Sequence, residues 1–362
     1  MQPRFRIVLA LVAGLVVCAA SPCPADETSR LKKGTPDLKS AGPIAFGPQG
    51  ILFIGDPQGA AIFAIDTGDK NQSKADSGLR VENLDGKIAS LLGVDVKQLQ
   101  INDMQVNPVS GKVYFSLSRG KGPDAAPVIL RLGDKGELEE VSLKDVGFAK
   151  AMLPNPSEKL RRDALTRLEF VKGTVYVAGL SNEEFSSRFL AIPFPFKEAT
   201  QGTSVEIYHG SHGQFETRSP IRTFTAFDIN GETNLLAAYT CTPLVKIPVT
   251  QLKPGEKIKG TTVAELGNRN VPLSMFVYEK GGKNYILIAN NSRGVMKVST
   301  DDIDKIAGIT QRVADKAGLK YETIGDLKKV DRLARLDKDH AVILARADTP
   351  EGSMYLKAIA LP

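Results

Sequence analysis

The sequence is poor in several residues on which common active sites depend. Its 362 residues include no tryptophan, three cysteines and three histidines. The lack of tryptophan argues against a carbohydrate-binding surface built on aromatic platforms, although eight tyrosines leave such a surface possible. No Gly-x-Ser-x-Gly elbow occurs, and three histidines without a clear serine partner argue against a serine triad. Phosphate-binding and dinucleotide-binding glycine motifs and a CxxCH haem motif are also absent.

The sequence also lacks a strong excess of one charge. Lysine and arginine total 47 against 41 aspartates and glutamates, a formal net charge of +6. Acidic and basic residues are interspersed, as between Glu137 and Lys150, which is typical of a solvated surface. Nucleic-acid binding requires a clustered basic face, so we expect no nucleic-acid partner.

Long apolar runs are missing except at the N-terminus. Arg4 and Arg6 precede an apolar stretch from Ile7 to Val17, which is too short to span a bilayer comfortably. We interpret the first 25 residues as a signal peptide, cleaved after Ala25 or, less favourably, after Ala20; an uncleaved membrane anchor is the alternative. The mature protein is expected to be periplasmic or secreted, and to have no membrane segment.

The cysteine count bounds the disulfides. Cleavage after Ala25 would leave Cys241 alone, without an internal disulfide. Cleavage after Ala20 would retain Cys23 and make a Cys23–Cys241 bond possible, since exported proteins can form disulfides.

The most informative feature is a repeat in which one apolar run, a turn and a second apolar run follow each other. The openings recur roughly every 50 to 65 residues, the scale of one propeller blade. The six openings are GPIAF (42–46), NDMQV (102–106), TRLEF (166–170), TFTAF (223–227), LSMFV (273–277) and DRLAR (331–335).

This repeat predicts an all-β fold, a single β-propeller over residues 41–362 with a polar lead-in over residues 26–40. Six blades are expected; five or seven remain open because an N-terminal strand could close the last blade. A two-sheet sandwich is the poorer alternative for a chain of this length. Apolar residues at helical spacing predict short helical inserts at 82–100 and 301–318.

The starts of the inner strands converge on the central channel in a propeller, so polar residues there form a candidate site. Such a mouth could bind a cation through oxygen ligands or grip a carboxylate or phosphate through paired arginines. Alternatively, the same side chains bridge neighbouring blades. The residues concerned are Asn102, Asp103, Arg167, Asp331 and Arg332.

A second candidate is the loop YHGSHGQFETRSPIR (208–222). His209 and His212 could share a metal ion if the loop curls, and Glu216 could serve as a third ligand or as a general base. Cys241 ends a strand of the next repeat and could add a thiolate, favouring zinc or copper. The alternative is a polar loop whose histidines bond to the backbone.

Two loops rich in amide and hydroxyl groups, GLSNEEFSSR (179–188) and ANNSRG (289–294), form a third candidate. Asn182, Asn290 and Arg293 would suit a polar or anionic ligand. Turn formation is the competing explanation for the asparagines.

Two segments carry a resemblance to a known family. GPIAFGPQGILFIGD (42–56) resembles the opening blade, and NDMQVNPVSGKVYFSLSRG (102–120) the second motif, of the gluconolactonase and senescence-marker-protein family. The resemblance implies a six-bladed propeller that holds a divalent cation in its channel and hydrolyses lactones or related esters. Asn102 and Asp103 match the family's Asn-Asp motif, where the asparagine serves substrate or metal. The place of the metal-binding glutamate is Ala41. The wider group of NHL-like secreted propellers, many of which only bind, is also similar.

Three functional hypotheses follow. The first is a metal-dependent hydrolase of lactones or esters, using calcium or zinc, in which Arg167 stabilises oxyanion charge and Glu216 acts as base. The second is a non-catalytic propeller that binds a small molecule or a protein. The third is a copper-dependent redox protein. In each case we expect a monomer.

Overall fold

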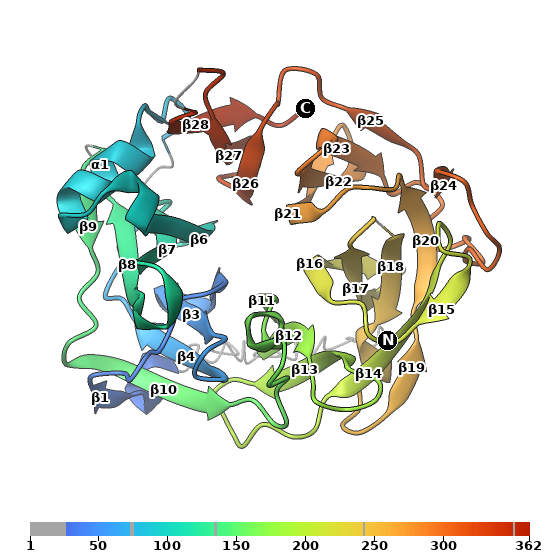
Figure 1. Ribbon diagram of the computed structural model, residues 1–362, viewed down its shortest axis with the longest axis horizontal. Coiled ribbons are helices and arrows are strands. Elements are labelled where there is room, and N and C mark those ends of the chain that lie inside the picture. Colours follow the sequence, from blue (N-terminus) through green and yellow to red (C-terminus); the bar gives the residue numbers. More distant parts are fainter. Residues whose placement is uncertain (1–26, 73–75, 134–135, 242, 350–351) are drawn as a thin grey trace, which may run out of the picture.

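Six small sheets stand around a central axis in the computed structural model (Figure 1). The predicted signal peptide lies outside the described residues, and no helix within them is long and apolar enough to cross a bilayer. The structure describes residues 27–72, 76–133, 136–241, 243–349 and 352–362.

Each sheet begins at one of the six openings, and we number the blades in that order. Blade 1 contains β2 (Ile44–Phe46), β3 (Ile51–Asp56), β4 (Ala61–Asp66), β10 (Val146–Met152) and β1 (Lys32–Gly34). Blade 2 contains β6 (Leu99–Val106), β7 (Val113–Arg119), β8 (Ala126–Leu132) and β9 (Leu138–Glu140). Blade 3 contains β11 (Arg167–Val171), β12 (Thr174–Leu180), β13 (Ser187–Pro193) and β14 (Thr203–His209), with β15 (Gln214–Glu216) and β19 (Lys257–Lys259) paired to β14.

The last three blades are built in the same way. Blade 4 contains β16 (Ile221–Ile229), β17 (Glu232–Tyr239), β18 (Pro243–Pro248), β20 (Thr261–Leu266) and β24 (Lys316–Gly318). Blade 5 contains β21 (Pro272–Lys280), β22 (Lys283–Asn290), β23 (Gly294–Ser299) and β25 (Tyr321–Thr323). Blade 6 contains β26 (Val330–Arg335), β27 (His340–Arg346), β28 (Met354–Ala360) and β5 (Arg80–Val81). The prediction of a six-bladed propeller is confirmed.

The blades do not follow one another around the ring in sequence order. β2 of blade 1 packs against β6 of blade 2 on one side and against β11 of blade 3 on the other. β26 of blade 6 packs against both β21 and β6. Blade 2 therefore lies between blade 1 and blade 6, as Figure 1 shows, and the chain passes blade 1 again on its way to blade 3.

Two outer strands secure this arrangement. After blade 2 the chain runs along the outside of blade 1 as β10, which pairs with β4. β5, from the connection between blades 1 and 2, pairs with β28 and completes blade 6. The sequence allowed for an N-terminal strand that closes the last blade. In the structure the first strand, β1, pairs with β10 and so belongs to blade 1.

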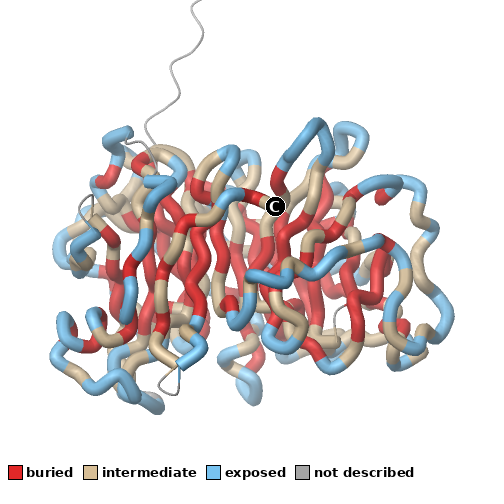
Figure 2. The backbone as a smooth tube through the Cα atoms, turned by 90° about the horizontal axis from the view of Figure 1, so that it is seen from above, coloured by how far each residue is buried: buried red, intermediate tan, exposed pale blue. Residues whose placement is uncertain are grey.

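The core lies between neighbouring blades. The second strand of each blade is rich in apolar residues, because both of its faces pack against other blades; every residue of β3 is buried. Figure 2 shows the buried residues as a central band, with exposed turns at both rims. The rims are consequently where polar side chains can meet a ligand.

The two predicted helical inserts have different outcomes. The first insert contains a helix, α1 (Leu84–Leu92). The structure also has short 3-10 helices: η1 (Glu27–Arg30), η2 (Pro48–Gly50), η3 (Val96–Gln98), η4 (Gly122–Asp124), η5 (Arg161–Ala164) and η6 (Val249–Gln251). The prediction of a second helix is wrong: residues 301–305 form turns and the chain then extends into β24. This segment crosses from blade 5 to the outer edge of blade 4, where β24 pairs with β20. An extended chain covers that distance, whereas a helix of the same residues would be much shorter.

We expect α1 to be a structural part of the ring. Ile88 is fully buried in the core between blades 2 and 6, whereas Leu91 on the same helix is 47% exposed. Replacing Ile88 with alanine should lower the free energy of unfolding by about 2–3 kcal/mol. Leu91→Ala is the matched control and should cost less than about 0.5 kcal/mol. Equal midpoints of denaturant unfolding for the two variants would contradict this assignment.

Candidate functional site

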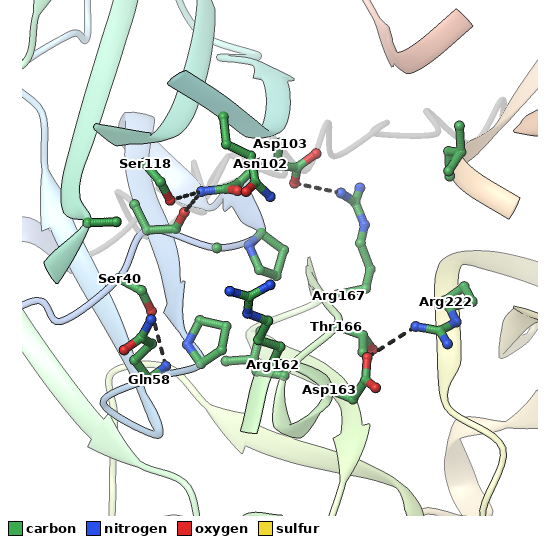
Figure 3. A pocket seen from close by; sticks show the side chains of 18 of the residues that line it. Ser40, Gln58, Asn102, Asp103, Ser118, Arg162, Asp163, Thr166, Arg167 and Arg222 are labelled. Carbon is green, nitrogen blue, oxygen red and sulfur yellow. Dashed lines mark hydrogen bonds and ion pairs between the residues drawn. The ribbon is translucent and has the colours of Figure 1, made fainter. Parts of the chain in front are cut away.

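A pocket of about 690 Å³ occupies the axial mouth where the inner strands begin (Figure 3). All six blades contribute to it, as the convergence of the openings predicts. Its polar side chains include Ser40, Gln58, Gln100, Asn102, Asp103, Ser118, Lys121, Arg162, Asp163, Thr166, Arg167, Arg222 and Arg332.

Asp103 lies in this pocket, but its carboxylate is already occupied. Oδ2 accepts a hydrogen bond from the backbone N–H of Ile44 at 2.9 Å and pairs with Nη1 of Arg167 at 3.0 Å. Oδ1 accepts from the N–H of Met104 at 2.8 Å and lies 3.9 Å from Nε of Arg332. The carboxylate thus joins strands of different blades, and the neighbouring guanidinium groups oppose a cation at the same place.

Asn102 and Arg332 also join blades. The Asn102 amide donates to the carbonyl of Ala41 at 2.7 Å and to Oγ of Ser118 at 2.9 Å. Arg332 donates from Nε and Nη2 to the carbonyl of Asn102 at 3.2 and 2.7 Å. The structure therefore gives these mouth residues the bridging role that the sequence left as an alternative.

Two cationic side chains in the pocket are uncommitted. Within the described residues, neither Arg162 nor Lys121 has a hydrogen-bond or ion-pair partner. Arg162 comes from η5, directly before the third opening, and Figure 3 shows its guanidinium extending into the pocket. Sequence reasoning missed Arg162, although the run RRDALTR carries two arginines just upstream of that opening.

The charges around the pocket do not balance. Among the described residues that line the pocket, five side chains are cationic, against the carboxylates of Asp103 and Asp163. Asp163 pairs with Nη1 of Arg222 at 3.1 Å, and Asp103 with Arg167. Because both carboxylates are used by arginines, the mouth presents a net positive field to an incoming molecule.

The remaining predicted ligand-binding residues lie elsewhere. Asp331 pairs with Nε of Arg346 at 3.0 Å in a smaller cavity beside blade 6. Asn290 is buried and bonds to the carbonyls of Ile288 and Gly294, and Arg293 pairs with Asp315 at 3.1 Å. Asn182 is exposed and its N–H donates to the carbonyl of Asn155. None of these four lines the axial pocket.

The second predicted site does come together. One nitrogen of His209, one of His212 and Sγ of Cys241 lie within 4.8 Å of one another. His209 ends β14 and His212 lies in the following turn, while Cys241 follows β17 of the next blade. The cluster therefore sits at the seam between blades 3 and 4.

Glu216 lies behind the two histidines. Its Oε2 is 3.0 Å from Nδ1 of His209 and its Oε1 is 2.5 Å from Nδ1 of His212, and Ser219 also donates to it. Burial would raise the pKa of the Glu216 carboxyl, but these three hydrogen bonds outweigh burial and lower the pKa to about 2. The carboxylate orients both imidazoles and has no oxygen left without a partner.

A second carboxyl is buried next to this turn. Glu265, on β20, accepts a hydrogen bond from the N–H of Gly210 at 2.5 Å through Oε1, while Oε2 is buried without a partner in the described part of the chain. Burial raises the pKa of Glu265, and the Gly210 N–H and the two histidines oppose that rise. This packing fixes the turn that carries the histidines.

The two sites lie on the same face of the propeller. Cys241 directly follows Thr240, whose Oγ1 accepts a hydrogen bond from Nε of Arg222 at 3.0 Å. Arg222 in turn pairs with Asp163 and lines the axial pocket. A short chain of contacts thus joins the histidine–cysteine cluster to the mouth.

No family model matches the sequence, and no curated protein matches it. Similar solved structures include the PQQ-bound aldose sugar dehydrogenase of Streptomyces coelicolor, 13% identical with a TM-score of 0.37, covering 91% of this chain and 97% of that one. A streptogramin B lyase is 12% identical with a TM-score of 0.35, and the match covers 92% of this chain and 87% of that one. The GH43 endo-arabinanase of Bacillus licheniformis is 10% identical with a TM-score of 0.36, and the match covers 81% of this chain and 97% of that one. At these identities and scores the likenesses carry no argument about activity, and the six-bladed propeller rests on the sheets described above.

Proposed function

We propose that this protein is an exported binding propeller whose axial mouth takes a small molecule bearing a carboxylate or phosphate. The observation that carries this proposal is the charge imbalance of the mouth. Arg162 and Lys121 face the pocket without partners among the described residues, while the pocket's two carboxylates are held by other arginines.

The pocket suits such a ligand in size and chemistry. Its volume is within the usual range of small-molecule sites. A guanidinium offers two parallel N–H donors to a carboxylate or phosphate, and the apolar wall of Pro43, Pro57, Leu165 and Leu273 would strengthen that interaction by excluding water.

Binding is better supported than lactone or ester hydrolysis. The described residues that line the pocket include no histidine or cysteine, and neither of their two carboxylates is free to act as a base. Arg167 is committed to Asp103, and Glu216 belongs to the separate cluster with the histidines. The residues expected to cooperate in hydrolysis are therefore apart.

Calorimetric titration of the mature protein with citrate and with inorganic phosphate tests the proposal. We expect saturable 1:1 binding of at least one anion, weakened by salt, and at least 10-fold weaker in Arg162→Ala. Arg161→Ala is the matched control, because Arg161 lies on the same turn but does not line the pocket. No saturable binding, or equal losses in both variants, would contradict the proposal.

A further inference from the structure

We propose that His209, His212 and Cys241 bind a late first-row transition-metal ion, zinc or copper, at the seam between blades 3 and 4. This site is separate from the axial pocket, and the proposal does not depend on anion binding there. It rests on the geometry of three donors, one shared carboxylate and one unpartnered buried nitrogen.

The separation of the donor atoms is close to that required by a single ion. Zinc–nitrogen bonds are about 2.0–2.1 Å and zinc–sulfur bonds about 2.3 Å, so two ligands of one ion lie at most about 4.4 Å apart. One nitrogen of each imidazole and Sγ of Cys241 lie within 4.8 Å of one another, slightly more than this limit. A small rotation of the half-buried Cys241 side chain would bring its sulfur into range.

The shared carboxylate determines which nitrogens are available. Glu216 accepts from Nδ1 of both histidines, which leaves Nε2 of each ring as the atom with a free lone pair. A carboxylate that accepts from the far nitrogen of a ligating histidine is the usual support of a metal site, because it fixes the tautomer and raises ligand basicity. One glutamate supports two histidines in this way.

The histidine nitrogen that would bind the ion has no other partner. His209 is 2% exposed, and its Nε2 is buried without a hydrogen bond to any described residue. A buried unpaired nitrogen costs about 1–3 kcal/mol. Coordination of a metal ion by Nε2 would remove that cost, whereas a purely structural histidine would be expected to find a backbone partner.

The backbone presents these donors in a fixed arrangement. The carbonyl of His209 accepts from the N–H groups of His212 and Gly213 at 3.1 and 2.8 Å, which closes the turn between the two rings. Cys241 adopts a positive φ of 61° and its N–H donates to the carbonyl of Asn270 at 2.7 Å. An ordered site of this kind would lose little conformational entropy when the ion binds.

The donor set also selects the class of ion. Two imidazoles and a thiolate suit zinc and copper, whereas calcium and magnesium prefer oxygen ligands. The thiolate and the Glu216 carboxylate together would balance the charge of a divalent ion. The His212 side chain is 47% exposed, so the ion would be reachable from solvent and would keep one coordination position open.

Metal loading of the protein that begins at Asp26, without a histidine tag, tests the proposal. The protein is dialysed against zinc sulfate, or against copper(I) under reducing conditions, and retained metal is counted by mass spectrometry. We expect about one equivalent of zinc or copper, with affinity at least 100-fold lower in His212→Ala and in Cys241→Ser, and 10- to 100-fold lower in Glu216→Gln. The ion retained more tightly identifies the metal.

Controls separate coordination from folding and from surface binding. His212 and Cys241 are not fully buried, so their variants should fold, and each unfolding temperature without metal should match the parent. His340→Ala is the matched control, since this histidine bonds to Asp337 in blade 6, and it should retain the metal. Cobalt loading should produce thiolate charge-transfer absorption that Cys241→Ser removes.

Either of two results would overturn the proposal. The first is that the protein retains less than about a tenth of an equivalent of zinc and less than about a tenth of an equivalent of copper. The second is full metal retention in a His212→Ala/Cys241→Ser double variant. If the protein retains no metal, rapid alkylation of Cys241 by iodoacetamide that depends on His209 would point to a different role. That outcome would assign the cluster to thiol chemistry assisted by a histidine instead.

Discussion

Replacing Asp103 with alanine is expected to lower the free energy of unfolding by about 3–5 kcal/mol. The change removes a buried carboxylate that accepts two backbone N–H groups and leaves the buried Arg167 without its counterion. Arg332 also loses a nearby opposite charge. Urea unfolding followed by tyrosine fluorescence and circular dichroism measures the effect.

The control for Asp103 is an exposed ion pair. Asp348→Ala breaks a pair with Lys329 in which both side chains are largely exposed, and it should change stability by less than about 1 kcal/mol. Asp103→Ala with unchanged stability and a lost calcium site would show that Asp103 is a ligand of a cation at the channel mouth, and not a bridge between blades.

Replacing Phe53 with alanine is expected to cost about 3–5 kcal/mol. Phe53 is 0% exposed and its ring packs against Phe170, Phe194 and Phe196 of blade 3, with centroid distances of 5.5, 5.0 and 5.9 Å. This contact holds blade 1 to blade 3, which is not its neighbour in the sequence. Its loss would create a cavity at that seam.

The matched control for Phe53 is the same substitution at a half-exposed position. Phe215 is 50% exposed, so Phe215→Ala should cost less than about 1.5 kcal/mol. Similar urea midpoints for the two variants would contradict a direct seam between blades 1 and 3, and with it the order of blades around the ring.

The repeat allowed the propeller architecture to be predicted from the sequence, but it did not predict the order of the blades around the ring. Openings such as TRLEF and TFTAF carry local signals of strand, turn and apolar period, and each became an inner strand. The position of blade 2 between blades 1 and 6 depends on β5 and β10, short outer strands whose partners lie far away in the sequence. No local pattern specifies such pairing.

The insert at 301–318 shows a similar limit. Ile303 and Ile306 occur at helical spacing, and that spacing predicts a helix. Residues 301–305 form turns instead, and these turns bury Ile303 between blades 4 and 5. Gly308 then adopts a φ of 100° before the chain extends toward β24. Packing of Ile303 between two blades therefore decided the local structure, and the helical spacing of the isoleucines did not.

The candidate sites were predictable to different degrees. Because Cys241 ends a strand of the repeat that follows the His209 loop, the sequence raised the possibility that it lies near the two histidines, and the structure brings the three residues together. The supporting position of Glu216 requires side-chain geometry that spacing does not provide. Arg162 was missed because an arginine on a rim loop looks the same whether it faces solvent or a pocket.

Anomalous diffraction from crystals soaked in selenate would test anion binding at the axial mouth, because the signal of selenium locates the oxyanion. We expect a selenium peak in the axial mouth within hydrogen-bond distance of the Arg162 guanidinium, and loss of this peak in Arg162→Ala crystals. A mouth without selenium while selenate occupies other surfaces, or a peak that persists in Arg162→Ala, would contradict the proposal that Arg162 makes the mouth an anion-binding site.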